Sequence, residues 1–358
     1  MIAARLLGAQ IMSGSDLNHN PGCSLAHPAC LLGDTLLGYE VFAMRGSDMD
    51  RWTHPATILV ATDLSDLDHL MPFALEQAGE TRARLILLHV IPASVAVIAA
   101  DASGMPYYNT TSAIETAEEM LEPWCQVAAR RGIRCERVVH EGHATQQIAA
   151  AVRQFEADRL LLGTRSRSKL GKLLLGSVAE QVLRSVYLPV MTVGPEAHLP
   201  VAGGQERVVL HATTLRETSR PSAALACQLA ASRNAKLVLL HVLPPIEVMQ
   251  RKNMPTGTES RAMVELRILA EETGAGCCSA VEPVVLHGNP FIEILALASD
   301  RHADMIVLGA TRRLAFEHLT RERTIYRVLS HARCPVLTLR EPQAMALAAT
   351  ANVLMAHH

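Results

Sequence analysis

Aromatic residues and lysines are scarce in this chain of 358 residues. Phe, Trp and Tyr together contribute 3% of the residues, whereas apolar residues contribute 49%. We therefore expect cores built from Leu, Val, Ile and Ala side chains. Only four lysines are present, and the formal net charge is −2. This balance lacks the basic excess of general nucleic-acid-binding proteins, so we expect no nucleic-acid partner.

Long apolar runs and paired cysteine motifs are also missing. No apolar run reaches the roughly 18 residues of a membrane-spanning helix, so we expect no membrane partner. The eight cysteines contain no Cys-x-x-Cys pair, and a chain of this length can fold without disulfides. We therefore expect reduced thiols and a cytoplasmic protein. We expect no metal site, because the early cluster fits no standard zinc spacing: His19, Cys23, His27 and Cys30.

The stretch Asp158–Gly194 contains a strand, a loop, a helix and a second strand. Arg159–Leu162 is a short apolar run typical of a parallel strand buried on both faces, and Gly163 ends it. After the loop, Gly176-Ser177 opens an amphipathic helix, and Ser177 and Glu180 have the spacing of a capping box. The apolar face of this helix comprises Val178, Val182, Leu183 and Val186.

A basic loop separates the strand from the helix. Its cationic residues are Arg165, Arg167, Lys169 and Lys172. A helix N-terminus attracts anions through its free backbone N–H groups and its dipole. Gly176 allows a phosphate to approach the backbone, and the Ser177 hydroxyl can donate a further hydrogen bond. The pattern leaves two interpretations open: a phosphate-binding loop, or a solvated basic loop before an ordinary capped helix.

The spacing of this loop resembles the G-x2-G-x9-G-[S/T] nucleotide motif of the universal stress protein family. Gly163 and Gly176-Ser177 match the motif, whereas Ser166 stands where the second glycine belongs. The neighbouring segments LLLGSVAEQVLR and LPVMTVG are also similar to that family. Because the surrounding strands and helix agree with the motif, the resemblance covers the whole unit from His54 to Pro195.

The first folded unit spans residues 54–196 and alternates strands with helices. Its predicted strands are Thr57–Thr62, Arg84–Val90, Arg134–Val139, Arg159–Leu162 and Val190–Val193. Helices are expected over Asp66–Glu80, Thr111–Arg131 and Ala144–Phe155, and Ala93–Tyr108 is expected to be an irregular connection. This order predicts a doubly wound parallel sheet with helices on both sides. The resemblance implies that this is a Rossmann-like α/β fold of the adenine nucleotide alpha hydrolase-like type.

The resemblance implies a binding site for ATP, with or without Mg²⁺, at the carboxyl ends of these strands. The implied nucleotide-binding residues are Ala61, Thr62, Asp63, Val90, Leu162, Gly163, Arg165, Ser166, Gly176, Ser177 and Val178. Asp63 would contact the nucleoside and Val90 the adenine through its backbone. From the residues alone, Asp63 and Ser65 are equally compatible with a turn that caps the next helix.

The pattern repeats after a linker at residues 197–205. Residues 206–340 form the second predicted unit, in which Ala235–Val242 matches Ala83–Val90, including the ending LLHV. Thr214 replaces Asp63, and Glu322-Arg323 replace Gly176-Ser177. Because Glu322 would repel a phosphate, we expect ATP in the first unit only and a structural or regulatory second unit. Residues 1–53 are predicted to be a poorly ordered extension, and residues 341–358 a tail.

The sequence therefore predicts two universal stress protein domains in tandem. We expect their last strands, Val190–Val193 and Val336–Leu339, to pair as an intrachain pseudo-dimer or within a homodimer, since exposed apolar edges are liabilities. Three functions remain open: an ATP-binding stress regulator, a non-nucleotide interaction module, and a related ATP-using enzyme. No Walker-type loop or magnesium-binding carboxylate pair is present, so we expect no rapid catalysis.

Overall fold

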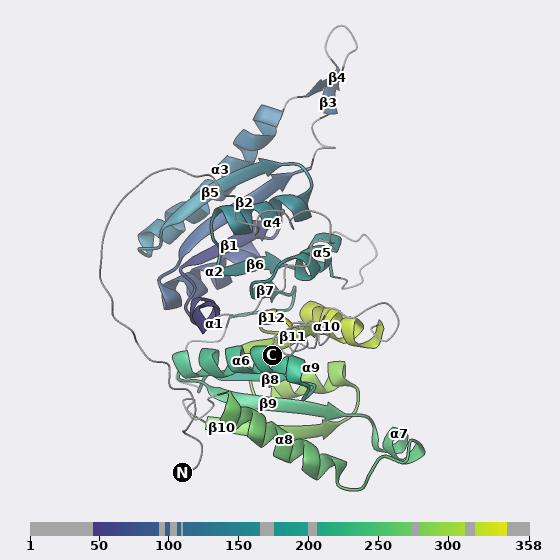
Figure 1. Cartoon of the computed structure of the whole chain (residues 1–358). Coiled ribbons are helices and arrows are strands. Elements are labelled where there is room, and N and C mark those ends of the chain that lie inside the picture. The colour runs from purple at the N-terminus through teal and green to yellow at the C-terminus, as the bar shows by residue number, and fades with distance from the viewer. Residues whose placement is uncertain are drawn as a thin grey trace, which may run out of the picture. The chain divides into compact units, whose positions relative to one another are not determined.

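A computed structural model describes residues 46–92, 97–100, 106–108, 110–164, 175–199, 206–273, 280–311 and 319–341. Within these residues, ten strands form one sheet, in the order β10-β9-β8-β11-β12-β7-β6-β1-β2-β5. Helices cover both faces of the sheet (Figure 1). Each half of the sheet is one of the two predicted repeats, so the tandem α/β fold is confirmed.

The first repeat contains five parallel strands. They are β1 (Thr57–Thr62), β2 (Arg84–Ile91), β5 (Cys135–Glu141), β6 (Arg159–Gly163) and β7 (Val190–Val193). The connecting helices are α2 (Leu67–Thr81), α3 (Thr110–Arg130), α4 (Ala144–Gln154) and α5 (Ser177–Ser185). The strand order places β1 between β2 and β6, as in a doubly wound sheet.

The second repeat has the same order of strands in the sheet. Its strands are β8 (Val208–Ala212), β9 (Lys236–Leu243), β10 (Ala280–His287), β11 (Met305–Thr311) and β12 (Val336–Glu341). Its helices are α6 (Arg220–Ser232), α7 (Ile246–Arg251), α8 (Thr258–Glu272), α9 (Pro290–Asp300) and α10 (Leu319–His331), with a short 3-10 turn at Glu217–Ser219. Strands β8 and β11 therefore correspond to β1 and β6.

The two halves of the sheet meet where β12 pairs with β7 in the antiparallel direction (Figure 1). Leu337 lies opposite Met191, and both side chains are completely buried. Thr192 Oγ1 also donates a hydrogen bond of 3.2 Å to Val336 O. The predicted intrachain pairing of the last strands is thus confirmed, and it removes two apolar edges.

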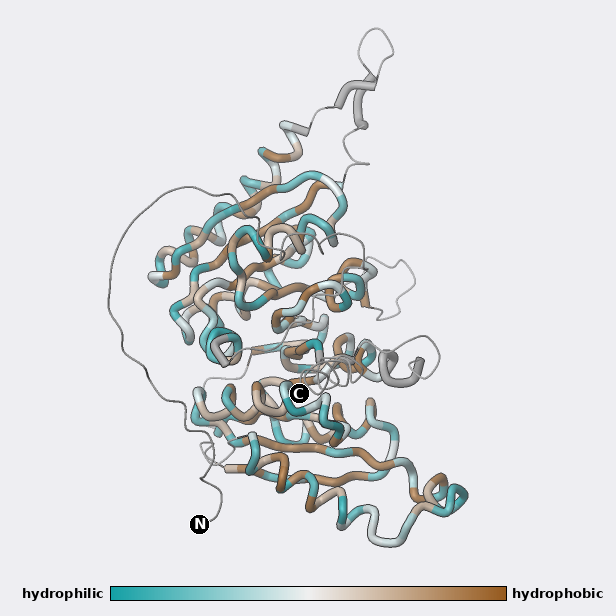
Figure 2. The backbone as a smooth tube through the Cα atoms, in the orientation of Figure 1, coloured by the Kyte–Doolittle hydropathy of each residue, from teal (hydrophilic) through white to brown (hydrophobic). Residues whose placement is uncertain are grey.

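Apolar side chains form one core on each face of the sheet. Helices α2, α3, α6 and α8 pack on one face, and α4, α5, α9 and α10 pack on the other. Hydrophobic residues run along the central strands in Figure 2, as expected for parallel strands covered on both faces. Strand β5 is an edge strand with exposed residues, in agreement with its alternating sequence.

Two segments for which the sequence predicts no regular structure contain short elements. Residues Gly46–Thr53, at the end of the predicted N-terminal extension, form helix α1, in which Trp52 and Thr53 are buried. Part of the connection predicted to be irregular forms an antiparallel pair, β3 (Val97–Ala100) and β4 (Pro106–Tyr108). The tail beyond Glu341 lies outside the described residues.

The expectation of reduced thiols is wrong for two cysteines. A disulfide joins Cys125 of α3 to Cys135 of β5. The chain turns from the helix into the edge strand within ten residues and brings the two Cα atoms to 5.1 Å, which a disulfide can span. Spacing along the sequence does not reveal this approach, because it depends on how α3 packs on β5. The free cysteines among the described residues are Cys227 and Cys334, both buried.

Candidate functional site at the ends of β1 and β6

The candidate site lies where the first repeat changes its direction of winding. The chain leaves β1 toward β2 and leaves β6 toward β7, so the connections on neighbouring parallel strands diverge. In doubly wound sheets, ligands bind in the crevice outside the carboxyl ends of such strands. Asp63 follows β1, and Gly163 is the last residue of β6. The fold therefore brings together two residues that are 100 positions apart in the sequence.

Asp63 lies exposed at this edge of the sheet. Its Oδ1 accepts hydrogen bonds from Ser65 N at 2.9 Å and from Ser65 Oγ at 2.6 Å. These contacts form an Asx turn that holds the carboxylate in a fixed orientation. The structure therefore contains a turn formed by Asp63 and Ser65, as one of the two interpretations of these residues expects. The helix that follows has Asp66 at its N-cap and no side-chain cap, so neither residue caps it.

A polar cluster around Thr62 lies at the carboxyl end of β1. Thr62 Oγ1 donates to Asp66 Oδ1 at 2.6 Å and accepts from Leu64 N at 2.9 Å. Leu64 adopts a left-handed backbone conformation with φ of 72°. A Cβ atom built on Gly163 would lie 2.2 Å from Asp66 Oδ2, so this position admits only glycine in the observed arrangement. Sequence reasoning did not select Asp66, although it lies three residues after Asp63.

The remaining strand residues of the predicted site lie in the strands beside the Thr62 cluster. Ala61 of β1 lies opposite Leu162 of β6, and both side chains are buried. Val90 is half-buried in β2 and faces away from its neighbour His89. The ring of His89 is held by a 3.0 Å hydrogen bond from Nδ1 to Thr62 O, which supports a positioning role within the strand ends.

The helix on the far side of the loop begins as predicted but is capped differently. Gly176 is the N-cap of α5, Ser177 is its first residue, and no side chain caps it. The predicted capping box is therefore wrong: Glu180 bonds Arg184 at 2.8 Å, one turn further along the helix. The prediction that Val178 belongs to the apolar face is also wrong, since this residue is 40% exposed. An N-terminus without a side-chain cap leaves its N–H groups for an anion.

Part of the predicted phosphate loop, including Arg165 and Ser166, lies outside the described residues. The described parts of the site therefore comprise the strand ends, the Asp63 turn and the start of α5. Among the described residues, no group of three or more His, Cys, Asp or Glu side chains could hold a metal ion.

The corresponding end of β8 in the second repeat keeps the turn but differs in its polar groups. Thr213 Oγ1 accepts from Leu215 N at 3.1 Å, as Thr62 does from Leu64. Thr214, at the position of Asp63, shares a 2.9 Å hydrogen bond between its hydroxyl and that of Ser219. The carboxylate is therefore replaced by a neutral hydroxyl pair.

The helix that follows the second loop also differs. Helix α10 starts at Leu319, so Glu322 is its fourth residue. In the first repeat, the matching position, Gly176, precedes the helix. Glu322 thus lies in the first turn of α10, and an acidic residue of the helix takes the position that a glycine before the helix has in the first repeat.

Comparison with known proteins places both repeats in one family. The model of the universal stress protein family matches residues 56–194 and 206–340. The chain belongs to the universal stress protein family. Universal stress protein MJ0531 from Methanocaldococcus jannaschii is 28% identical over 142 residues, which cover 38% of this chain and 80% of that protein. YxiE from Bacillus subtilis is 28% identical over 144 residues, which cover 38% of this chain and 97% of YxiE.

Solved structures support the same fold. A universal stress protein from Archaeoglobus fulgidus DSM 4304 aligns with a TM-score of 0.62 and 22% identity, covering 80% of this chain and 98% of that one. A protein of unknown function from Pseudomonas aeruginosa aligns with a TM-score of 0.57 and 16% identity over 85% of this chain and 98% of that one. Both alignments are long enough to include the two repeats. No helix among the described residues is long and apolar enough to span a bilayer.

Proposed function

We propose that the first repeat binds one ATP molecule and that the protein acts as a nucleotide-dependent regulator of a stress response in the cytoplasm. The observation that carries this proposal is that Asp63 follows β1 and Gly163 ends the neighbouring strand β6, at the switch point of the sheet. A fixed carboxylate suits the hydroxyl groups of a ribose. The uncapped start of α5 at Gly176 and Ser177 suits a phosphate.

In this proposal the second repeat serves as a structural or regulatory half. Thr214 supplies no carboxylate, and Glu322 puts an acidic residue of α10 at the position that matches Gly176. We expect binding without rapid turnover. If Mg²⁺ accompanies the nucleotide, we expect its ligands to come mainly from the phosphates and water.

The best test is isothermal titration calorimetry of the full chain with ATP. We expect one site per chain, lost in the double variant Asp63→Ala with Gly176→Glu. Thr214→Ala is the matched control in the second repeat and should leave the affinity unchanged. A stoichiometry of two, or binding that survives the double substitution, would refute the assignment. An assay for ADP release would detect turnover.

A second function, an interaction module without nucleotide, is favoured by one observation. Ser166 replaces a glycine of the family motif. If that position needs a positive φ, a side chain costs roughly 1–2 kcal/mol, which weakens binding about tenfold or more. Complete absence of ATP binding in the calorimeter, with an intact fold, would favour this alternative. If ATP is the ligand of the first repeat, Ser166→Gly should restore its binding or make it tighter.

A further inference from the structure

The disulfide between Cys125 and Cys135 lies at the outer edge of the first repeat. Cys125 belongs to α3, and Cys135 is the first residue of β5, which is the last strand of the ten-stranded sheet. Strand β5 therefore has one neighbouring strand, β2, with which it pairs over Cys135–Glu141. Both cysteines are half-buried and pack against the margin of the core. The bridge thus lies at the boundary between core and surface.

The equivalent helix of the second repeat has no cysteine at this place. Cys125 comes four residues after Leu121 in α3, and Ala270 comes four residues after Leu266 in α8. Leu121 and Leu266 are completely buried, and each follows a buried alanine by four residues. The two helices therefore turn matching faces to the sheet, and Ala270 is the equivalent of Cys125.

The equivalent edge strand has no cysteine at this place either. Cys135 of β5 lies opposite Leu85, and Val281 of β10 lies opposite Leu237. Leu85 and Leu237 are equivalent residues of the repeated strand. In the second repeat α8 thus packs on β10 with an alanine and a valine in place of the two cysteines. A repeat folds without the bridge, so the bridge of the first repeat indicates a role of its own.

The charges around the bridge also differ between the repeats. Residues 125–137 contain one acidic residue, Glu136, and four basic residues, which are Arg130, Arg131, Arg134 and Arg137. The equivalent residues 270–283 contain no basic residue and three acidic ones, which are Glu271, Glu272 and Glu282. Arg137 is bonded to Glu122 at 2.7 Å, whereas the other three arginines are exposed. Cations beside a thiol favour the thiolate, which is the form that reacts with oxidants and disulfides.

The free cysteines among the described residues have the opposite surroundings. Cys334 is 7% exposed, and burial, followed by the charge of Asp304, raises the pKa of its thiol to about 12. Cys227 is 1% exposed, and its Sγ shares a hydrogen bond of 3.1 Å with Thr273 Oγ1. Thiols that are buried in apolar surroundings are inert. Cys227 and Cys334 are therefore internal controls for the reactivity of the bridge.

We propose that Cys125 and Cys135 form a reversible redox site, which hydrogen peroxide oxidises and a dithiol reductant reduces. In the oxidation, one thiolate attacks the peroxide, so that an S–O bond forms, the O–O bond breaks and hydroxide leaves. The second thiol then attacks the sulfenic sulfur, the S–S bond forms, and the oxygen leaves as water. Two electrons pass from the thiols to the peroxide. Reduction proceeds by thiol–disulfide exchange through a mixed disulfide.

This inference rests on the cytoplasmic location proposed above. A disulfide in that compartment is usually transient and redox-sensing, whereas one in a secreted protein is usually permanent. The two cases differ in whether glutathione reduces the bond, because permanent structural disulfides resist the glutathione pool. The state of the bond is therefore measurable without any information on nucleotide binding.

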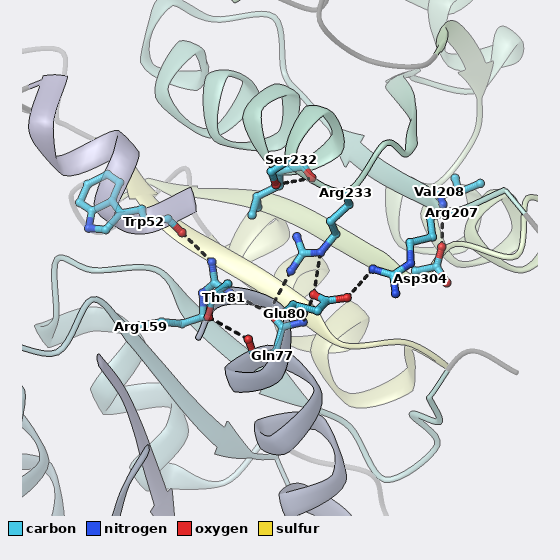
Figure 3. A network of polar contacts seen from close by, with 11 residues as sticks. Trp52, Gln77, Glu80, Thr81, Arg159, Arg207, Val208, Ser232, Arg233 and Asp304 are labelled. Carbon is cyan, nitrogen blue, oxygen red and sulfur yellow. Dashed lines mark hydrogen bonds and ion pairs between the residues drawn. The ribbon is translucent and has the colours of Figure 1, made fainter. Parts of the chain in front are cut away.

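The reduced and oxidised forms should differ at the edge of the sheet and not at the junction of the repeats. At the junction, Arg233 of the second repeat donates to Glu80 at 3.1 Å and to Gln77 at 3.0 Å, both in α2 (Figure 3). These contacts involve neither α3 nor β5. Reduction removes the covalent tie of β5 to α3 and leaves the pairing with β2. We therefore expect local loosening of α3 and β5.

The test starts from the reduced full chain and follows the bond by peptide mapping after blocking of the thiols. Trypsin cuts after Arg130, Arg131 and Arg134, so the two cysteines fall on peptides that only the S–S bond joins. We expect hydrogen peroxide to produce this linked pair, and a rising ratio of reduced to oxidised glutathione to remove it. Cys227 and Cys334 should stay reduced throughout. The map also separates the cysteines outside the described residues, which are Cys23, Cys30, Cys277 and Cys278.

Hydrogen exchange measured by mass spectrometry tests the structural consequence. In the reduced protein, amides of β5 and of the end of α3 should exchange about tenfold faster or more than in the oxidised protein. The equivalent elements α8 and β10 should be unaffected. The double variant Cys125→Ala with Cys135→Val carries the residues that the second repeat uses. It should fold and should show one exchange rate in peroxide and in reductant.

Two outcomes would overturn the proposal. One is a bridge that stays fully oxidised in a large excess of reduced glutathione, which would make it a permanent structural disulfide. The other is a peroxide reaction that leaves Cys125 and Cys135 unlinked. If the double variant does not fold, peptide mapping of the natural chain decides the question. Calorimetry of the oxidised chain with ATP reports separately on the proposed nucleotide site, so failure of one proposal is distinguished from failure of the other.

Discussion

The carboxylate of Asp66 occupies the space where a side chain at Gly163 would begin. A Cβ atom on Gly163 would lie 2.2 Å from Asp66 Oδ2 and 3.3 Å from Asp66 Cγ. Asp66 cannot turn away without breaking its 2.6 Å bond from Thr62 Oγ1. The end of β6 and the turn after β1 are therefore fitted to each other, and a change at either residue should disturb both.

We expect Gly163→Ala to destabilise the protein by roughly 1–3 kcal/mol through overpacking and to weaken ATP binding in the proposed site. Urea denaturation and calorimetry measure the two effects. Gly79→Ala is the matched control, since a Cβ atom added at Gly79 in helix α2 would meet no atom within 4 Å. That substitution should stabilise the protein by about 0.5–1 kcal/mol. Equal effects of the two substitutions would show that the contact with Asp66 is unimportant.

The antiparallel pairing of β7 with β12 gives a second prediction. Val336 is completely buried opposite Thr192. Val336→Asp places an unpaired carboxylate there and should lower the free energy of unfolding by more than about 3 kcal/mol. Val264→Asp, at a position 55% exposed on α8, should change it by less than about 0.5 kcal/mol. Denaturation and size-exclusion chromatography compare the variants; unchanged stability in Val336→Asp would contradict the observed pairing.

Much of this architecture could be predicted because its signals are local and occur twice. The apolar run Val190–Val193 is a strand with the predicted bounds, and the strand Arg84–Val90 extends by one residue only. Pairing of Val190–Val193 with the last strand was expected because both would otherwise be exposed apolar edges, and the structure shows the intrachain form of that pairing. The doubly wound order then placed Asp63 beside Gly163 without any information on distances.

Other features depended on contacts that no pattern encodes. Helix α1 is short and largely polar, and it is held by Trp52 in the core and by Arg51 on Asp158. The disulfide depends on how α3 packs against β5. The role of Asp66 became visible only when Gly163 lay against it. The capping box failed because the backbone of Gly176 already supplies the N-cap, which moves Ser177 to the first helical position.

Reduction of the Cys125–Cys135 disulfide should destabilise the first repeat. The bridge closes a loop with a sequence separation of ten residues, for which the chain-entropy model gives roughly 2–3 kcal/mol. We expect the unfolding midpoint to fall when a dithiol reductant is added. The double variant Cys125→Ser with Cys135→Ser should already have the lower midpoint and should not respond to the reductant. A reductant response of equal size in that variant would assign the effect to other cysteines.

A buried histidine should make the stability depend on pH. His211 of β8 is completely buried, its Nδ1–H donates to Val307 O at 3.0 Å, and its Nε2 has no hydrogen-bond partner among the described residues. Burial lowers the pKa of His211 to about 4, against an ordinary value of about 6.5. The neutral ring is therefore preferred in the folded chain, because no described group would accept a hydrogen bond from a proton placed on Nε2.

The sign of the pH effect follows from this difference. Between about pH 6.5 and pH 4 the unfolded chain binds a proton at His211 that the folded chain does not. The contribution of His211 to stability is therefore complete above pH 6.5 and falls by roughly 3 kcal/mol as the pH drops to about 4. His241, whose pKa is also lowered by burial, adds to the same trend.

His211→Val is the decisive variant, because the first repeat carries Val60 at the equivalent, completely buried position. Urea denaturation at several values between pH 7 and pH 4.5 should show a shallower loss of stability in His211→Val than in the natural protein. The variant should be at least as stable at pH 7, since it removes the unsatisfied Nε2. His54→Ala, at an exposed position, controls for the loss of a histidine. If the natural chain and His211→Val lose stability with the same slope, protonation of His211 is not the cause of the acid sensitivity.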